Sequence, residues 1–298
     1  MRSRKTVRKY FLLTLTSLFL LAGIFFYQNA KLNDGKLHVV VCDVGQGDGI
    51  LIRTPNGSDI LVDGGPDDSI LNCLSSHLPF WDRTIELMVL THPHTDHAAG
   101  LVDVLKRYTV LHFVTEKVLG QTATYKRLED SLAAQKLTAK YLFAGDRVDL
   151  TDKTELLTLW PSAEWLIQSQ LQAANGINDN QNLDLNGFCL VQLFTYGNFT
   201  MLLTGDAGAN VEDKIAAEAG KVGVLKVPHH GSKTGMSDYF LSVINPSLAI
   251  ISVGANNRYG HPAQSALDLL KSHNIKTLRT DKNGAVEVVS DGQTFSIN

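Results

Sequence analysis

The sequence predicts a layered α/β/β/α domain that is preceded by one N-terminal transmembrane helix. Three observations predict it. Strand-like and helical runs alternate from Leu37 onward and fall into two sets. Histidines and carboxylates follow several of the apolar strands directly, where open α/β sheets place their chemistry. The chain has 298 residues, 44% of them hydrophobic and 19% charged, which is enough for one large domain (37–298) and an appendage.

The appendage begins with a basic flank, residues 1–9, followed by an uncharged stretch from Tyr10 to Tyr27. Eighteen helical residues span about 27 Å, close to the thickness of a bilayer core. The basic flank predicts a cytoplasmic N-terminus, a single-pass signal anchor and an extracytoplasmic domain. Cleavage as a signal peptide, which would give a secreted protein, is the alternative. Residues 28–36 are polar and are expected to form a linker.

The domain itself is expected to mix short strands with helices. Pro55-Asn56-Gly57 predicts a hairpin turn. Residues 163–186 predict a helix followed by a surface loop. The expected strands are Leu37–Cys42, Gly49–Arg53, Asp59–Val62, Glu86–Leu90, Leu111–Thr115, Phe188–Thr195, Phe199–Leu203, Val222–Val227, Leu248–Ser252, Thr277–Arg279, Ala285–Ser290 and Thr294–Ile297. The expected helices are Ser69–His77, Ala98–Tyr108, Tyr125–Gln135, Asn210–Ala219, Asp238–Ile244 and Ala263–Ser272.

Charge and cysteine content exclude some classes of protein. The net charge is −3 and the sequence pI is about 6.4, unlike a dedicated nucleic-acid-binding domain. Any contact with nucleic acid would use a local patch. The three cysteines are odd in number and widely spaced, so they imply no disulfide framework and no C-x-x-C zinc pattern. Cys42 and Cys73 are expected to be small buried residues.

The run Thr91-His92-Pro93-His94-Thr95-Asp96-His97 is the most specific pattern in the chain. Three imidazoles and a carboxylate beside one tight loop suit zinc, manganese or iron. His92 and His94 can bind one metal, and Asp96 with His97 can bind a second. Two metals a few ångströms apart can hold a hydrolytic water and the leaving oxygen. An exposed His-rich loop would not explain the matching groups downstream.

Further candidate ligands follow other strands. Asp63 ends one strand and is expected to orient a ligand histidine, or else to cap the Ser69 helix. Asp206 is expected to bridge two ions, its alternative being an N-cap for the next helix. Of the adjacent pair His229-His230, an extended backbone would direct only one toward the metals, and we expect His230 there and His229 on the substrate side. His261 is a further candidate, as a ligand or a general acid, its alternative being an ordinary surface histidine.

These motifs together resemble the metallo-β-lactamase superfamily. The closer resemblance is to the extracytoplasmic metallo-β-lactamase-like domain of the ComEC DNA-uptake family. The residues that carry it, besides Thr91–His97, are Asp43-Val44-Gly45-Gln46-Gly47-Asp48, Leu203-Thr204-Gly205-Asp206, Leu225-Lys226-Val227-Pro228-His229-His230-Gly231-Ser232, and Ser252-Val253-Gly254-Ala255-Asn256-Asn257-Arg258-Tyr259-Gly260-His261-Pro262.

The resemblance implies an αββα sandwich with a site for two divalent ions, zinc or manganese. His92 and His94 would serve the first metal, Asp96, His97 and His230 the second, and Asp206 both. Many superfamily members have a further first-metal histidine, but residues 98–205 contain only His112. We therefore expect the first metal to be weakly held, or completed by water, by His261 or by an amide such as that of Asn186. The Cys189 thiol is a further candidate ligand, but an inward-facing strand cysteine is the commoner explanation.

The resemblance implies a hydrolase, and we expect a phosphodiesterase that cleaves DNA outside the membrane. Asp96 would orient the attacking water or take its proton, and His229 and His261 would line the catalytic side. Support is expected from residues that orient ligands or contact phosphate: Asp63, Asp43 and Asp48 for the ligands, and Lys226, Lys233 and Arg258 for phosphate.

Two alternatives stay open. One is a hydrolase of a small or cell-wall-linked phosphoester, which suits the acidic pI. The other is a non-catalytic metal- or DNA-binding module that assists a separate uptake channel. ComEC proteins carry a many-helix channel region, whereas this sequence has one candidate span, so only the hydrolytic function carries over. The oligomeric state stays open.

Overall fold

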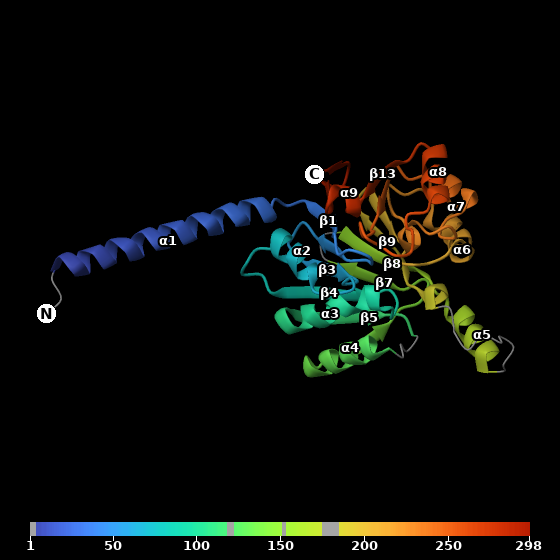
Figure 1. Cartoon of the computed structure of the whole chain (residues 1–298), viewed down its shortest axis with the longest axis horizontal. Helices are drawn as coiled ribbons and strands as arrows, with labels where there is room; N and C mark the ends of the chain where they lie inside the picture. The colour runs from blue at the N-terminus through green and yellow to red at the C-terminus, as the bar shows by residue number, and fades with distance from the viewer. Residues whose placement is uncertain (1–3, 118–121, 151–152, 175–184) are drawn as a thin grey trace.

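Two β-sheets stacked face to face, with helices on both outer faces, form the body of the molecule (Figure 1). The computed structural model describes residues 4–117, 122–150, 153–174 and 185–298. This arrangement confirms the predicted αββα sandwich.

The first sheet has the strand order β15-β14-β1-β2-β3-β4-β5-β6. Strands β3 to β6 are mutually parallel, and the remaining pairs are antiparallel. Its strands are β1 (Leu37–Val41), β2 (Ile50–Arg53), β3 (Asp59–Val62), β4 (Thr84–Leu90), β5 (Thr109–Thr115), β6 (Ala139–Tyr141), β14 (Val286–Ser290) and β15 (Phe295–Ile297).

The second sheet has the strand order β13-β12-β11-β10-β9-β8-β7. Strands β10 to β13 are mutually parallel, so their C-terminal ends lie along one edge. Its strands are β7 (Arg147–Leu150), β8 (Thr154–Trp160), β9 (Val191–Tyr196), β10 (Phe199–Leu203), β11 (Val224–Lys226), β12 (Leu248–Ile251) and β13 (Lys276–Arg279).

Helices cover the outer face of each sheet (Figure 1). Those on the first sheet are α2 (Ser69–His77), α3 (Thr95–Arg107) and α4 (Ala123–Ala134). Those on the second are α6 (Ala209–Ala219), α7 (Asp238–Ile244) and α8 (Gln264–Ser272). The remaining helical segments are α5 (Ala163–Ala174), α9 (Thr280–Asn283), and the 3-10 turns η2 (Leu185–Phe188) and η3 (Pro228–Gly231).

The alternation of apolar residues along the strands builds three layers of core. In β1, Val39 and Val41 point between the two sheets, whereas Val40 points toward the helices of the first sheet. All three are buried. Because both faces of the central strands are covered, these strands are mostly apolar, with their polar residues near the strand ends. The packed core fixes the strand ends that carry the candidate site.

Several local predictions need correction. The helix expected from Ala98 begins at Thr95, and the strand expected from Phe188 begins at Val191. Strands β6, β7 and β8 fall in an interval where we predicted none. The surface loop expected after α5 lies largely outside the described residues.

The N-terminal helix α1 (Arg4–Leu32) projects away from the body (Figure 1). Its segment Thr6–Ala30 is long and apolar enough to cross a membrane, and none of that segment is buried. The linker expected at residues 28–36 is shorter, because the helix continues through Leu32.

Cys42 and Cys73 are joined by a disulfide bond, which corrects the prediction of two separate buried cysteines. Both are buried, as expected. Cys42 directly follows β1 and Cys73 lies in α2, which packs over that strand. Their proximity depends on this tertiary contact, and the spacing of cysteines along the sequence cannot reveal it.

Candidate metal centre

The site forms where strands of both sheets end. Thr91 to His94 connect β4 to α3, and the peptide carbonyl of His94 accepts hydrogen bonds from the backbone N–H of His97 and Ala98. Asp96 and His97 therefore lie in the first turn of α3 instead of in a loop. A carboxylate in this position is favoured by the helix dipole.

Four side chains from three elements converge here. The ligand atoms of Asp96, His97, Asp206 and His230 all lie within 4.8 Å of one another. Asp206 Oδ1 is 3.3 Å from His97 Nε2 and 3.3 Å from His230 Nε2. Asp96 Oδ2 is 3.7 Å from the same His230 nitrogen. Asp206 follows β10 and His230 follows β11, so the second sheet supplies half of the group.

The inner nitrogens of both histidines are held by acceptors. His230 Nδ1 lies 2.9 Å from the Ser252 carbonyl oxygen, which can only accept, so Nδ1 carries the proton. His97 Nδ1 donates in the same way to Asp63 Oδ2 at 2.7 Å. Each Nε2 is therefore the nitrogen that faces the centre, the arrangement that ligand histidines require, and its lone pair is available to a cation once that nitrogen has lost its proton.

The atoms that face the centre are otherwise unsatisfied. Within the part of the chain that the structure describes, His97 Nε2, His230 Nε2 and Asp206 Oδ1 are buried and form no hydrogen bond. Unsatisfied buried polar atoms are rare in native proteins and call for an explanation. One divalent cation between two imidazoles and a carboxylate would satisfy all three. The donor set fits zinc or manganese.

Asp63 forms a rigid support under this group. Its Oδ1 accepts from the backbone N–H of Thr91 at 2.8 Å, and its Oδ2 accepts from the Thr91 hydroxyl at 2.7 Å as well as from His97. Its φ is 58°, in the left-handed region that Asp and Asn tolerate best. The alternative role as a helix cap is wrong, because Asp68 holds the N-cap position of α2.

His92 and His94 lie beside the four converging groups. His92 Nε2 is 2.9 Å from His94 Nδ1, so two donors face one point. Neither histidine belongs to a group of three or more such donors among the described residues. The two nitrogens are close enough to bind one ion together, and the weakly held first metal stays a prediction.

Cys189 lies behind His92, with its Sγ 3.7 Å from His92 Nδ1. Burial raises the pKa of the thiol to about 12, and the Asp206 carboxylate adds to the shift. The sulfur accepts a hydrogen bond from the Asp206 backbone N–H. It approaches Gly205 so closely that a Cβ there would lie 2.3 Å from Sγ. A protonated thiol in this place supports the Asp206 loop and is a poor metal ligand.

The segment His229-His230 is not extended, which corrects our prediction. Both residues have left-handed backbones, with φ of 45° and 53°, in η3. Left-handed non-glycine residues cost about 1–2 kcal/mol each and gather at functional sites. His230 is buried and faces the group, and His229 reaches Asp206 Oδ2 at 3.8 Å from the solvent side. Asp206 caps no helix, because α6 has its N-cap at Gly208.

The pKa values of the histidines and carboxylates in this group are shifted in opposite directions. Burial alone would lower the pKa of His97, but the Asp206 and Asp63 carboxylates raise it well above its usual value. Burial would raise the pKa of Asp206, but His230 and His97 hold it well below its ordinary value. Asp206 is therefore ionised and available to a cation.

The supporting residues differ from our expectations. Lys226 is fully buried, forms an ion pair with Asp48 and donates to the Gly205 carbonyl at 3.2 Å, so the prediction that it contacts phosphate is wrong. Asp48 Oδ1 lies 3.5 Å from His230 Nδ1, beneath the site. Asp43 is exposed and lies in a turn, so its predicted role in orienting a ligand is also wrong. Lys233 and Arg258 are exposed.

A cleft of about 340 Å³ opens above the converging groups. His261 lies on its rim, 5.7 Å between ring centroids from His229, and its ring stacks on Tyr259. The cleft is lined by Gln46, His94, Thr95, Asp96, Asn186, Asp206, His229, His230, Tyr259 and His261.

The chain matches a known protein family over most of its length. The family model described as "Metallo-beta-lactamase superfamily" matches residues 42–255. The chain belongs to the metallo-β-lactamase superfamily. Proteins of this fold bind divalent metals, typically two, and its members are generally metal-dependent hydrolases.

The curated relatives confirm the resemblance to the ComEC family. ComE operon protein 3 of Bacillus subtilis is 27% identical over 86% of this chain, and Competence protein ComA of Neisseria gonorrhoeae is 27% identical over 90%. Recombination protein 2 of Haemophilus influenzae is 30% identical over 87%. These matches cover 33%, 34% and 29% of the relatives, so the chain spans about a third of their length.

Solved structures share the fold. YhfI of Bacillus subtilis, a metallo-β-lactamase fold protein, aligns with a TM-score of 0.55 and 11% identity, over 85% of this chain and 99% of that one. Zinc-bound PqqB of Methylobacterium extorquens aligns with a TM-score of 0.54 and 13% identity, over 81% and 97%.

Three residues of this metallo-β-lactamase centre lie in the quoted motifs, but the sequence reasoning assigned them no role. The Thr91 hydroxyl contacts Asp63 and His92, the Ser252 carbonyl accepts from His230, and Gln46 lines the cleft. The neighbouring glycine, Gly47, is a sequence feature that could have indicated the position of Gln46 next to the site. Its φ is 136° and a Cβ there would lie 2.0 Å from the Asp96 carbonyl, so this segment packs directly against the start of α3.

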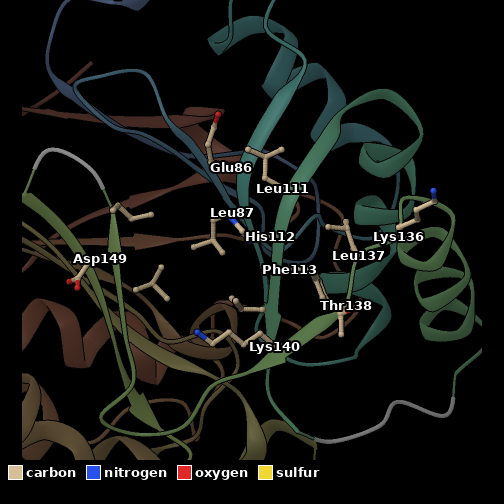
Figure 2. A pocket seen from close by; sticks show the side chains of 13 residues that line it. Glu86, Leu87, Leu111, His112, Phe113, Lys136, Leu137, Thr138, Lys140 and Asp149 are labelled. Atoms are coloured by element: carbon tan, nitrogen blue, oxygen red, sulfur yellow. The ribbon is translucent and has the colours of Figure 1, made fainter.

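A larger cavity of about 450 Å³ lies elsewhere, between β4, β5, β6 and β7 (Figure 2). Figure 2 shows Asp149 on one side and Lys136 on the other, with Leu87 and Phe113 between them. Its charged groups are at the rim and do not converge, and no metal-ligating group of three lies there among the described residues. The chemistry therefore belongs to the smaller cleft.

Proposed function

We propose that this chain is a membrane-tethered, extracytoplasmic phosphodiesterase that cleaves DNA. The observation that carries it is the convergence of His97 Nε2, His230 Nε2 and Asp206 Oδ1, unsatisfied and buried beneath an open cleft. The competence and recombination proteins among the relatives support DNA as the substrate. Exposed Lys233 and Arg258, adjacent to the motif segments, offer cations for its phosphates.

The proposed ligand sets are His92 with His94 for one ion, and Asp96, His97 and His230 for the other, with Asp206 between them. A bound divalent ion supplies Lewis acidity and lowers the pKa of water to about 7. Burial alone would raise the pKa of Asp96, but the nearby imidazoles of His230 and His97 hold it below its ordinary value. Asp96 is therefore a weak base, suited to orienting a water through its second oxygen.

His229 and His261 are suited to proton transfer at the cleft. Burial lowers the pKa of His229 despite the attraction of Asp206. Burial also lowers the pKa of His261, and the neighbouring His229 adds to the shift. Both imidazoles are neutral at pH 7 and face the cleft, so either can accept a proton from a nucleophile above the centre.

The disulfide supports the extracytoplasmic side. Disulfides persist in oxidising compartments and are rare in the cytosol. The bond joins buried Cys42 and Cys73, and the N-terminal basic flank favours the same topology.

The experiment uses the full chain, stripped of metal with a chelator and then supplied with manganese or zinc. We expect cleavage of single- or double-stranded DNA that chelation abolishes and that His94→Ala and Asp206→Ala each reduce by at least 100-fold. His112→Ala, an exposed histidine of β5, is the matched control and should retain activity. Unchanged cleavage in both site variants would refute the proposal, and metal binding without cleavage would favour a binding module.

A small phosphoester is a second candidate substrate. The cleft volume of about 340 Å³ is that of a small-ligand site, and the net charge of −3 gives no general attraction for DNA. Rates on plasmid DNA, single-stranded DNA and bis-p-nitrophenyl phosphate, measured in parallel, separate the two. Turnover of the small diester alone would favour this candidate.

A further inference from the structure

A tight turn between α2 and β4 exposes two aromatic side chains next to each other. The Asp82 backbone N–H donates to the Pro79 carbonyl, which places Phe80 and Trp81 at the tip. Phe80 is 53% exposed and Trp81 is 37% exposed, and their rings meet edge to face at 4.9 Å. Single exposed apolar residues are common, but an adjacent aromatic pair at a tip indicates a contact surface.

The turn packs against the end of α1. The Trp81 ring lies 4.5 Å from the Phe25 ring, and the Phe80 backbone N–H donates to Gln28 Oε1 at 3.3 Å. Arg53, which is buried, donates to the Leu32 carbonyl at 3.0 Å and so fixes the last turn of the helix. The helix is therefore fixed to the domain, and the turn keeps a constant position beside it.

This position sets the depth of the turn. Phe25 lies two residues before Tyr27, where the uncharged stretch ends, which is about 3 Å along the helix axis. When α1 spans a bilayer, the Trp81 ring that contacts Phe25 reaches the boundary between hydrocarbon and headgroups. Tryptophan and tyrosine are enriched at that boundary because their rings are amphipathic.

We propose that the turn Pro79–Asp82 is a second membrane contact, in which Phe80 and Trp81 enter the interface of the outer leaflet beside α1. The inference rests on the membrane anchor of the proposed function. Cations near the turn suit anionic headgroups, although Asp82 in the turn pairs with Arg53 and Lys106 pairs with Asp103. Arg83 follows it and stacks over Tyr108, and exposed Lys106 and Arg107 end α3 next to that tyrosine.

The contact would fix the direction in which the metal centre faces. Trp81 lies before β4 and His92 lies just after it. The seven residues of β4 span about 23 Å. Figure 1 shows β4 running in roughly the direction of α1, so with α1 across a bilayer the strand would carry the cleft away from the membrane surface, toward the aqueous side.

The test uses the full chain in vesicles of phosphatidylethanolamine and phosphatidylglycerol, with or without lipid brominated near the carbonyl end of the acyl chain. Bromine quenches tryptophan by contact. Because Trp81 is one of three tryptophans, we expect quenching of up to about one third in the wild type. Trp81→Phe should abolish the quenching and Phe80→Trp should increase it.

Trp165→Phe is the matched control, because Trp165 lies in α5 on the opposite side of the body from α1 (Figure 1). It should retain the bromine effect. Equal quenching in wild type and Trp81→Phe, or none in Phe80→Trp, in chains that float with the vesicles would overturn the second contact and leave the anchor standing. Failure to float with vesicles would overturn the anchor and the contact together.

Discussion

Replacing Asp63 by Asn tests how the metal centre is supported. Asp63 Oδ2 accepts from His97 Nδ1 and from the Thr91 hydroxyl, both at 2.7 Å. Asn retains an oxygen for the Thr91 backbone N–H but turns the other acceptor into an NH2 donor. Asn also tolerates the φ of 58°, so the backbone is unaffected, whereas Ala would be strained there.

The expected effect falls on the tautomer of His97. Facing an NH2 group, Nδ1 must accept, and the proton moves to Nε2, the atom that faces the centre. Metal binding then has to restore the other tautomer against this hydrogen bond. We expect metal affinity to fall about 10- to 100-fold, or about 1.4–2.7 kcal/mol. The free energy of unfolding of the metal-free protein should also fall, because the variant removes one partner of the buried Asp63–His97 pair.

The assay is competition for zinc and manganese against a chromophoric chelator, with far-UV circular dichroism to verify folding. Asp43→Asn is the matched control. Asp43 is exposed, so the metal affinity of this variant should match that of the wild type. A folded Asp63→Asn protein that binds metal within twofold of the wild type would refute the proposed role of the Asp63–His97 hydrogen bond.

Three further predictions concern stability and reactivity. Replacing Cys42 and Cys73 by Ser opens a 31-residue loop and should lower the unfolding free energy by about 3–4 kcal/mol in urea titrations. His38 donates to Glu287, which raises the pKa of His38 and lowers that of Glu287 to about 2. His38→Gln should lower the free energy of unfolding by about 1 kcal/mol at pH 5.5. The loss should be smaller when the pH rises past the raised His38 pKa or falls below 4.5, and a loss that does not change with pH would contradict this. Buried Cys189, whose pKa is about 12, should resist iodoacetamide at pH 8 until the protein unfolds, as mass spectrometry would show.

Much of the fold could be predicted because apolar periodicity and polar strand ends are local signals. The helices Ser69–His77 and Asp238–Ile244 have the bounds that we predicted. The two-sheet arrangement followed from the order of strands and helices. The pairing of Cys42 with Cys73 did not, because it depends on how α2 packs over β1.

The candidate site shows the same division. The metal-binding histidines and aspartates could be predicted from the sequence because each of them follows the end of an apolar strand. The prediction failed where conformation or burial decides, as at His230, whose left-handed backbone no propensity predicts. It failed also at Lys226, where a cation next to a motif lies inside the core and pairs with Asp48. Ser252 supplies only a backbone carbonyl, and no side-chain pattern reveals that.

The most direct test of the central claim measures bound metal and DNA cleavage in the same samples. The full chain would be stripped, loaded stepwise with manganese or zinc, and assayed for metal by mass spectrometry and for cleavage of a fluorescent single strand. The account predicts no cleavage without metal, a rate that rises with occupancy up to two ions per chain, and loss of both in Asp206→Ala. Cleavage that persists in the metal-free chain, or full occupancy without hydrolysis of any phosphodiester, would contradict it.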